Sequence, residues 1–284
     1  THMDYAVRAL EAGKHVLLEK PMETSLEKCN RIMEARDRSG KVLQIAMVCR
    51  HMEFYHNVKK AVHTEGFDPG YMMVEELRGP FASPWKYNTT MSGGLLVEKA
   101  CHTFDLFNWI SEKRPVRVVG MGGTEVINKG EFTDVLGNVT TIEDTSGIYD
   151  NAHVTIEYED GMRCSYHVCF FRNADYGIIH PMRVIGRNGE EVIGDLLKRE
   201  MNVTDGLAET MGIEEGRLEM DYGLFSLAEA GVEQLERFYE TVREDAPNTA
   251  TGEEGKLAIA MTLAAQQSID GDSQPVNIRD LPGF

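Results

Sequence analysis

The first 46 residues alternate between two kinds of apolar pattern. The run "DYAVRALEAG" carries apolar residues at helical spacing and ends at Gly13, and the strand-length run "HVLLE" follows it. A second helix leads through Ser39-Gly40 to the strand "VLQIA", and Thr24 and Glu27 have the spacing of a capping box at its start. This order of helix, strand, helix and strand predicts a parallel sheet.

Two parallel strands are too few for a complete domain. They leave the edges of the sheet unpaired and most of the helix faces uncovered. We therefore expect residues 1–46 to be the C-terminal half of a doubly wound domain, with its first half outside this sequence.

From about residue 47 the pattern changes to strands joined by tight turns. The runs "NAHVTIEYE" and "MRCSYHVCF" alternate in polarity on either side of Asp160-Gly161, and "MRVIGRNGEEVIGD" does so around Asn188-Gly189, which are strong hairpin signals. Longer periodic segments predict helices over about 95–110, 223–244 and 253–268. The expected fold is α/β plus α+β: an incomplete parallel sheet, then a larger domain with a mostly antiparallel sheet and helices on one face.

Composition narrows the function classes. The 46 acidic and 29 basic residues give a formal net charge of −17, which disfavours nucleic acid and anionic membranes as partners. No apolar stretch approaches the ~18 residues that span a bilayer, and the start lacks the layout of a signal peptide. The five cysteines are odd in number and lack CxxC spacing, so we expect no metal site, no disulfide framework and a cytoplasmic protein.

The strand "HVLLE" ends in a charged pair and a proline, Glu19-Lys20-Pro21. Ligands of parallel α/β sheets bind beyond the carboxyl ends of the strands, and proline cannot continue a hydrogen-bonded ladder. A catalytic lysine would be placed at such a strand end. The alternative is that these charges merely mark where the strand reaches the surface.

Three polar residues interrupt the most apolar helix, "GGLLVEKACHTFDLFNWI". Glu98, His102 and Asp105 are spaced i, i+4 and i+7, which puts them on one face. Burying a carboxylate and an imidazole without partners costs several kcal/mol, so the stripe faces either its own network or a water-filled pocket. A satisfied structural Glu–His pair is the alternative.

The two motifs together resemble a known family. "AGKHVLLEKPM" looks like the strand-end motif of the Gfo/Idh/MocA oxidoreductases, and "SGGLLVEKACHTFDLFNW" resembles their second motif, G-G-x-x-x-D-x-G-x-H-x-x-D. Further similarity lies in Trp85-Lys86, in the hairpin sheet and in "TGEEGKLAIAMTLAAQQS". The resemblance therefore covers almost the whole chain.

The resemblance implies an enzyme that binds NAD or NADP on a Rossmann domain and oxidises or reduces sugars, cyclitols and related polyols. It assigns residues 1–46 to the C-terminal half of that domain and 47–284 to a substrate-binding and oligomerisation domain. Lys20 would hydrogen-bond the reacting oxygen, His102 would exchange the proton, and Glu98 would orient His102. The other residues that it implies are Glu19, Lys20 and Pro21 for the cofactor, and Trp85, Lys86 and Asp105 for the substrate.

The sequence departs from the family pattern in three places. Glu98 stands where aspartate is usual, and Lys99 brings a second cation where small residues are common. The phosphate-binding GxGxxG motif is absent from the sequence, so we expect this chain to bind the cofactor poorly.

Two other functions remain open at this point. One is a non-enzymatic fragment for oligomerisation or carbohydrate binding, and the other is an NAD-assisted lyase or glycosidase of the same superfamily. We also expect a homo-oligomer, a dimer or tetramer, formed through the antiparallel sheet.

Overall fold

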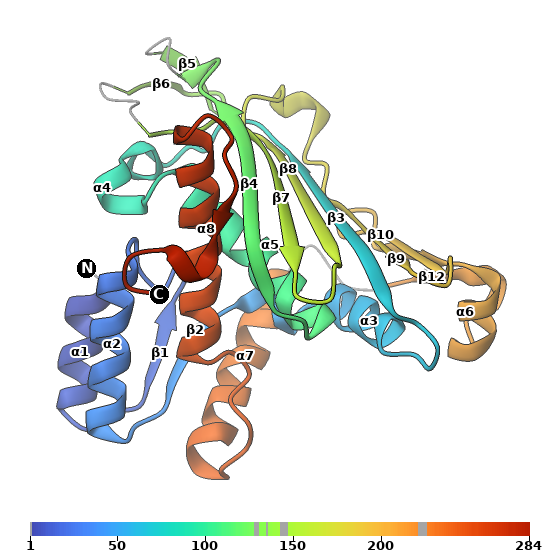
Figure 1. Cartoon of the computed structure of the whole chain (residues 1–284), viewed down its shortest axis with the longest axis horizontal. Helices are drawn as coiled ribbons and strands as arrows, with labels where there is room; N and C mark the ends of the chain where they lie inside the picture. Colours follow the sequence, from blue (N-terminus) through green and yellow to red (C-terminus); the bar gives the residue numbers. More distant parts are fainter. Residues whose placement is uncertain (1, 128–130, 135, 143–146, 221–225) are drawn as a thin grey trace.

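The computed structural model describes residues 2–127, 131–134, 136–142, 147–220 and 226–284. A small parallel sheet and a large mixed sheet organise these residues (Figure 1). The small sheet consists of β1 (Val16–Glu19) and β2 (Leu43–Ala46), which pair in parallel with Leu18 opposite Ile45. The predicted parallel pairing is confirmed.

Two helices accompany the small sheet, α1 (His2–Glu11) and α2 (Leu26–Ser39). The prediction that Thr24 and Glu27 form a capping box is wrong, because Ser25 is the N-cap: its backbone is extended and its side chain accepts from the backbone N–H of Lys28. Thr24 instead accepts a hydrogen bond from Nζ of Lys28. Gly40 ends α2 in the left-handed conformation, as the Ser39-Gly40 signal predicts.

The large sheet is antiparallel at all but one of its described pairings, and β3 and β8 form the parallel exception. Both predicted hairpins are present, as the pairs β7–β8 and β9–β10. The strands, in sheet order, are β12 (Arg217–Glu219), β11 (Glu200–Val203), β10 (Glu191–Asp195), β9 (Pro181–Gly186), β3 (Pro69–Leu77), β8 (Arg163–Cys169), β7 (Asn151–Tyr158), β4 (Pro115–Gly123) and β13 (Val276–Asn277). A separate antiparallel pair joins β5 (Glu131–Thr133) and β6 (Val139–Thr141).

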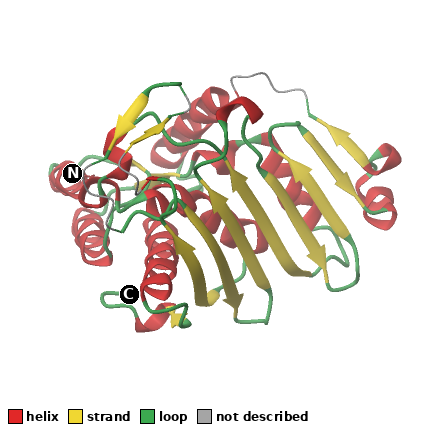
Figure 2. Ribbon diagram, turned by 90° about the horizontal axis from the view of Figure 1, so that it is seen from above, coloured by secondary structure: helices red, strands yellow, loops and turns green. Residues whose placement is uncertain are grey.

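Helices lie along one face of the large sheet, and the other face is open (Figure 2). The longer helices are α3 (Glu53–Val62), α5 (Leu95–Ser111), α7 (Ser226–Arg243) and α8 (Gly252–Asp270). The start predicted for α7, residues 223–225, lies outside the described residues. The short helices are η1 (Val48–His51), η2 (Pro84–Tyr87), α4 (Thr89–Ser92), η4 (Ala174–Tyr176), α6 (Asp205–Met211), η5 (Glu214–Gly216) and η6 (Ile278–Asp280).

Helix α8 connects the two sheets. It packs against α5 and β4 on one side and against α2 and β2 on the other. Its first turn carries a full capping box, in which the Thr251 side chain and the Glu254 carboxylate bond each other's backbone N–H groups. The buried core accordingly runs without a break from α1 to α8.

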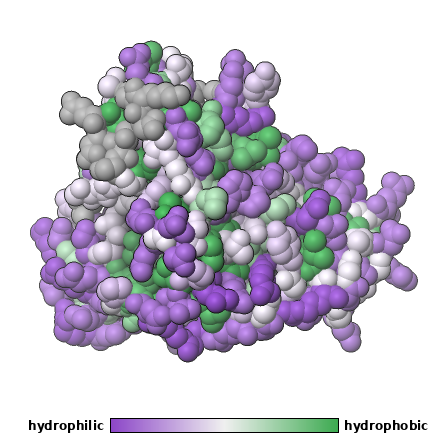
Figure 3. Space-filling model, turned by 45° about the horizontal axis from the view of Figure 1, so that its top comes forward, coloured by the Kyte–Doolittle hydropathy of each residue, from purple (hydrophilic) through white to green (hydrophobic). Residues whose placement is uncertain are grey.

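The surface is mainly polar. In Figure 3 the visible face is largely hydrophilic, and apolar side chains occur on it in small scattered groups. Among the described residues, no helix combines the length and apolar character needed to cross a membrane.

The contact between α8 and β4 leaves no room for a side chain at Gly120. A Cβ there would lie 2.9 Å from the backbone oxygen of Ala265, so Gly120→Ala is expected to lower the free energy of unfolding by ~1–3 kcal/mol. The matched change Gly231→Ala meets no atom within 4 Å and lies inside α7, so it is expected to be neutral or to stabilise by up to ~1 kcal/mol. Urea unfolding followed by circular dichroism checks both, and equal stabilities would contradict the close packing of α8 on β4.

Candidate active site

A pocket of about 640 Å³ opens where the carboxyl ends of β1 and β2 face α5 and the end of β3. Lys20 reaches it from the end of β1, and Val48 and Cys49 reach it from the segment after β2. This is the position at which parallel α/β sheets bind ligands. Its ionisable side chains include Lys20, Glu76, Arg78, Lys86, Glu98, Lys99, His102 and His180.

The carboxylate of Glu98 is the shared partner of two ammonium groups. Lys20 Nζ donates to Oε1 and to the backbone oxygen of Glu98, both at 3.0 Å, and Lys86 Nζ donates to the same Oε1 at 2.9 Å. Glu98 is only 4% exposed. Lys20, Lys86 and Glu98, predicted from distant parts of the sequence, are thus brought into direct contact.

These contacts set the charge states. Burial opposes the charge of Lys20, but Cys101 and Glu98 outweigh it and raise the pKa of Lys20 above its ordinary value. Burial raises the pKa of the Cys101 thiol to about 12, so this thiol is neutral at pH 7 and Glu98 is the neighbour that keeps Lys20 charged. Burial alone would raise the pKa of Glu98, yet Lys20 and Lys86 hold it below its usual range.

Lys86 behaves differently from Lys20 although both bind Glu98. Burial, together with the charges of Lys20 and Lys99, outweighs the attraction of Glu98 and lowers the pKa of Lys86. Burial and two neighbouring cations therefore make the charged form of Lys86 less favourable than that of an exposed lysine.

His102 lies in the same pocket but is not oriented by Glu98. Nδ1 of His102 and Oε2 of Glu98 are buried, and neither has a hydrogen-bond partner among the described residues. The expected hydrogen bond is therefore missing at these atoms, and Lys20 and Lys86 both bind the other oxygen, Oε1. Burial, followed by the charges of Lys20 and Lys99, lowers the pKa of His102 well below its ordinary value, so the ring is neutral at pH 7 and can accept a proton.

Asp105 does not reach the pocket, which corrects the prediction that it binds the substrate. Its carboxylate receives two hydrogen bonds from Arg50, at 2.8 and 2.6 Å, and both side chains are buried. Arg50 is also bound by the backbone oxygen of Thr249, at 2.6 Å, and by Glu254, at 2.9 Å. Asp105 thus serves a structural ion pair that joins α5 to the start of α8.

The remaining predicted residues, Glu19, Pro21 and Trp85, do not line the pocket. Glu19 is exposed, and neither Glu19 nor Pro21 belongs to the pocket wall, so Lys20 is the residue of this strand end that reaches it. The Lys20–Pro21 peptide bond is cis. Trp85 is 44% exposed. Nζ of the neighbouring Lys86 lies 5.5 Å from the centre of the Trp85 ring. The assignments of Glu19 and Pro21 to the cofactor and of Trp85 to the substrate stay predictions.

A second buried carboxylate of the pocket, Glu76, was not predicted from the sequence. It is 2% exposed, lies 3.1 Å from Nζ of Lys99, and accepts a hydrogen bond from the Tyr166 hydroxyl at 3.0 Å. The second cation expected at Lys99 is therefore paired. One signal was present in the sequence, since Met72, Val74 and Glu76 occupy alternate positions of β3 and a carboxylate in that series faces the buried side.

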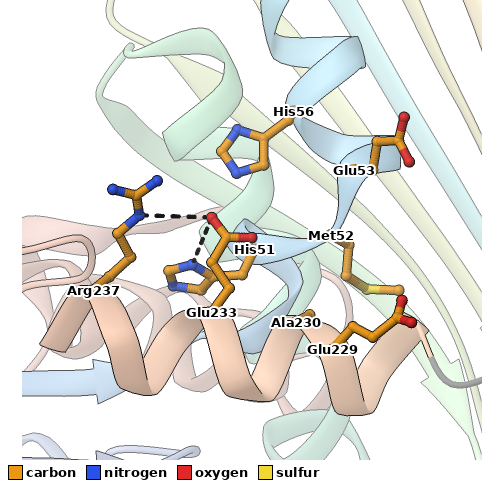
Figure 4. Close-up of a pocket in the computed structure, with 8 residues that line it drawn as sticks. All are labelled: His51, Met52, Glu53, His56, Glu229, Ala230, Glu233 and Arg237. Carbon is orange, nitrogen blue, oxygen red and sulfur yellow. Dashed lines mark ion pairs between the residues drawn. The ribbon is translucent and has the colours of Figure 1, made fainter. Parts of the chain in front are cut away.

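A smaller hollow of about 480 Å³ lies beside the pocket, between η1, the start of α3 and α7 (Figure 4). Glu233 of α7 faces His51 at 3.9 Å and Arg237 at 3.7 Å in this hollow. The contact between His51 and Glu233 joins η1 to α7, whereas the Arg237–Glu233 pair lies within α7.

Comparison with known proteins agrees with this fold. Residues 59–278 match the family model described as "Oxidoreductase family, C-terminal alpha/beta domain", and residues 1–47 match the NAD-binding Rossmann-fold model of the same family. Myo-inositol 2-dehydrogenase of Thermotoga maritima is 23% identical over 290 residues, which span all of this chain and 78% of that protein. Inositol 2-dehydrogenase 3 of Saccharopolyspora erythraea is 25% identical over 286 residues, which span all of this chain and 76% of that protein.

Solved structures share the fold. The crystal structure of a probable dehydrogenase from Thermotoga maritima matches with a TM-score of 0.76 at 23% identity, over 99% of this chain and 78% of that one. The two family models define a class of oxidoreductases with an NAD-binding Rossmann fold. Within that class, the chain belongs to the Gfo/Idh/MocA family.

The position of Asp105 gives a prediction about stability. Asp105→Ala is expected to lower the free energy of unfolding by ~3–5 kcal/mol, because it leaves Arg50 buried without its main partner. The loss should lie near the smaller of these values, since Glu254 remains beside Arg50. The double replacement Arg50→Met/Asp105→Leu removes both charges and is expected to recover most of this loss. Chemical unfolding measures both variants. An Asp105→Ala protein as stable as wild type, but with a raised KM, would instead support a substrate-binding role.

Proposed function

We propose that this chain transfers hydride between a secondary hydroxyl of a sugar or cyclitol and NAD or NADP. The proposal rests on one observation. A single pocket at the ends of two parallel strands contains Lys20, Glu98, Lys86 and His102. Membership of an oxidoreductase family supports it, and so do two relatives named as inositol dehydrogenases.

The pocket residues match what alcohol oxidation requires. The proton of the hydroxyl needs a neutral base, and the pKa direction of His102 keeps its ring neutral at pH 7. The oxygen gains alkoxide character as the hydride departs, and the charged Lys20 donates a hydrogen bond that stabilises it. Glu98 fixes the Lys20 ammonium through two hydrogen bonds, so the donor is oriented before the substrate arrives.

The residues present fit the nicotinamide end of the cofactor. Lys20, Val48 and Cys49 follow the carboxyl ends of β1 and β2 and combine a cation with an apolar wall. When bound, the nicotinamide supplies the hydride acceptor. The sequence contains no GxGxxG, so we assign pyrophosphate binding to no residue of this chain.

The proposal predicts large kinetic losses at two residues. Lys20→Ala and His102→Ala are each expected to lower kcat at least ~100-fold, because each removes a group that acts on the reacting oxygen or its proton. The exposed residues Lys60 and His153 provide matched controls, Lys60→Ala and His153→Ala, whose kcat is expected to stay within about twofold of wild type.

Turnover is followed by nicotinamide absorbance with NAD⁺ and NADP⁺ and a set of neutral and acidic polyols. A loss below tenfold in both pocket variants would overturn the assignment. Product formed without net reduction of the cofactor would favour the lyase or glycosidase function instead.

A further inference from the structure

The pocket carries an excess of positive charge in a strongly acidic protein. The described residues of its wall include five permanent or near-permanent cations against two carboxylates: Lys20, Arg78, Lys86, Lys99 and Arg199 against Glu76 and Glu98. The whole chain has a formal charge of −17. A cationic cleft in such a chain produces a local positive electrostatic potential, which attracts anions.

The two carboxylates are already engaged by these cations. Glu98 Oε1 is shared by Lys20 and Lys86, and Glu76 Oε1 lies 3.1 Å from Lys99 and 3.7 Å from Arg78. Each carboxylate therefore faces two cations, which leaves positive charge uncompensated. The positive field is also felt at His102, where it helps to lower the pKa of the ring.

Arg78 has unused hydrogen-bonding capacity. Its side chain is 15% exposed, and the 3.7 Å to Glu76 exceeds hydrogen-bond length. Nε of Arg78 is buried and has no hydrogen-bond partner among the described residues. Leaving a buried donor unpaired costs ~1–3 kcal/mol, so a guanidinium in this state is prepared for a ligand.

Phe81 holds Arg78 close to the proposed reaction centre. Cζ of Arg78 and Nζ of Lys86 each lie 4.1 Å from the centre of the Phe81 ring. Lys86 in turn binds the Glu98 oxygen that also binds Lys20. A ligand group at Arg78 is therefore a near neighbour of a hydroxyl at Lys20.

We propose that the substrate carries a carboxylate, which Arg78 binds while the reacting hydroxyl lies at Lys20 and His102. The substrate class is then a sugar acid or a cyclitol carboxylate, and this inference rests on the function proposed above. The planar guanidinium matches a carboxylate with two parallel hydrogen bonds, whereas a neutral polyol would leave the excess positive charge unbalanced. Glu76, between Lys99 and Arg78, acts as a positioning residue for this anion site.

The first test measures binding and needs no turnover. Isothermal titration calorimetry compares D-glucuronate, neutral D-glucose and D-glucose 6-phosphate on the wild-type chain and on Arg78→Met. We expect wild type to bind glucuronate at least ~10-fold more tightly than glucose, and Arg78→Met to lose ~10- to 100-fold in glucuronate affinity with no change for glucose. The exposed Arg163 gives the matched control, because Arg163→Met keeps wild-type affinities.

A second variant tests whether any loss of binding by Arg78→Met comes from misfolding. Arg78→Lys keeps the positive charge but loses the planar set of N–H donors that can bind both carboxylate oxygens. It is expected to bind glucuronate with intermediate affinity at an unchanged melting temperature. Equal affinity for glucuronate and glucose, or unchanged glucuronate binding by Arg78→Met, would overturn the inference. Tighter binding of the sugar phosphate than of glucuronate would overturn the carboxylate in favour of a phosphate.

The kinetic readout separates this inference from the proposed function. Arg78→Met is expected to raise KM for an acidic polyol with little change in kcat, whereas Lys20→Ala lowers kcat. Glucuronate binding that depends on Arg78, without turnover of any polyol, would support the anion site and contradict the dehydrogenase function.

Discussion

The structure depends on one carboxylate placed between two ammonium groups. Glu98 belongs to α5 of the large domain, Lys20 follows a strand of the small parallel sheet, and Lys86 lies in η2. The three charges would be costly to bury singly, and they compensate one another only when these segments meet. The ion pair thus fixes the position of the strand end relative to the helix, and it orients Lys20 toward the pocket that the proposed chemistry uses.

A second carboxylate divides the pocket into two ends. Around Glu98 lie Lys20 and Lys86, which suit a reacting oxygen, and around Glu76 lie Lys99 and Arg78, which suit a charged substituent. The Phe81 ring contacts one cation of each end, Arg78 and Lys86. The arrangement explains why a long cationic side chain at Lys99 is accommodated in a motif where small residues are common, because Glu76 receives its charge.

The sequence was most informative where a pattern is local. Both hairpins follow from Asp160-Gly161 and Asn188-Gly189, and α5 follows from a nearly continuous apolar segment, so these elements were predicted correctly. Helical spacing correctly placed Glu98 and His102 in one pocket. It could not show that Arg50, from another segment, binds Asp105. Nor could it show that two lysines bind one oxygen of Glu98 while the other makes no hydrogen bond to His102. The alternation along β3 indicated that Glu76 is buried, but not its partners, which come from α5 and β8.

The central claim is that this pocket passes hydride from a carbon-bound hydrogen to a nicotinamide. The most direct test incubates the chain with NAD⁺ or NADP⁺ and polyols, neutral and acidic, that are deuterated at their carbon-bound positions, and then analyses the recovered cofactor by mass spectrometry. The account predicts deuterium in the reduced cofactor with wild type and far less with Lys20→Ala. Deuterium lost to water, with none in the cofactor for any polyol, would contradict it.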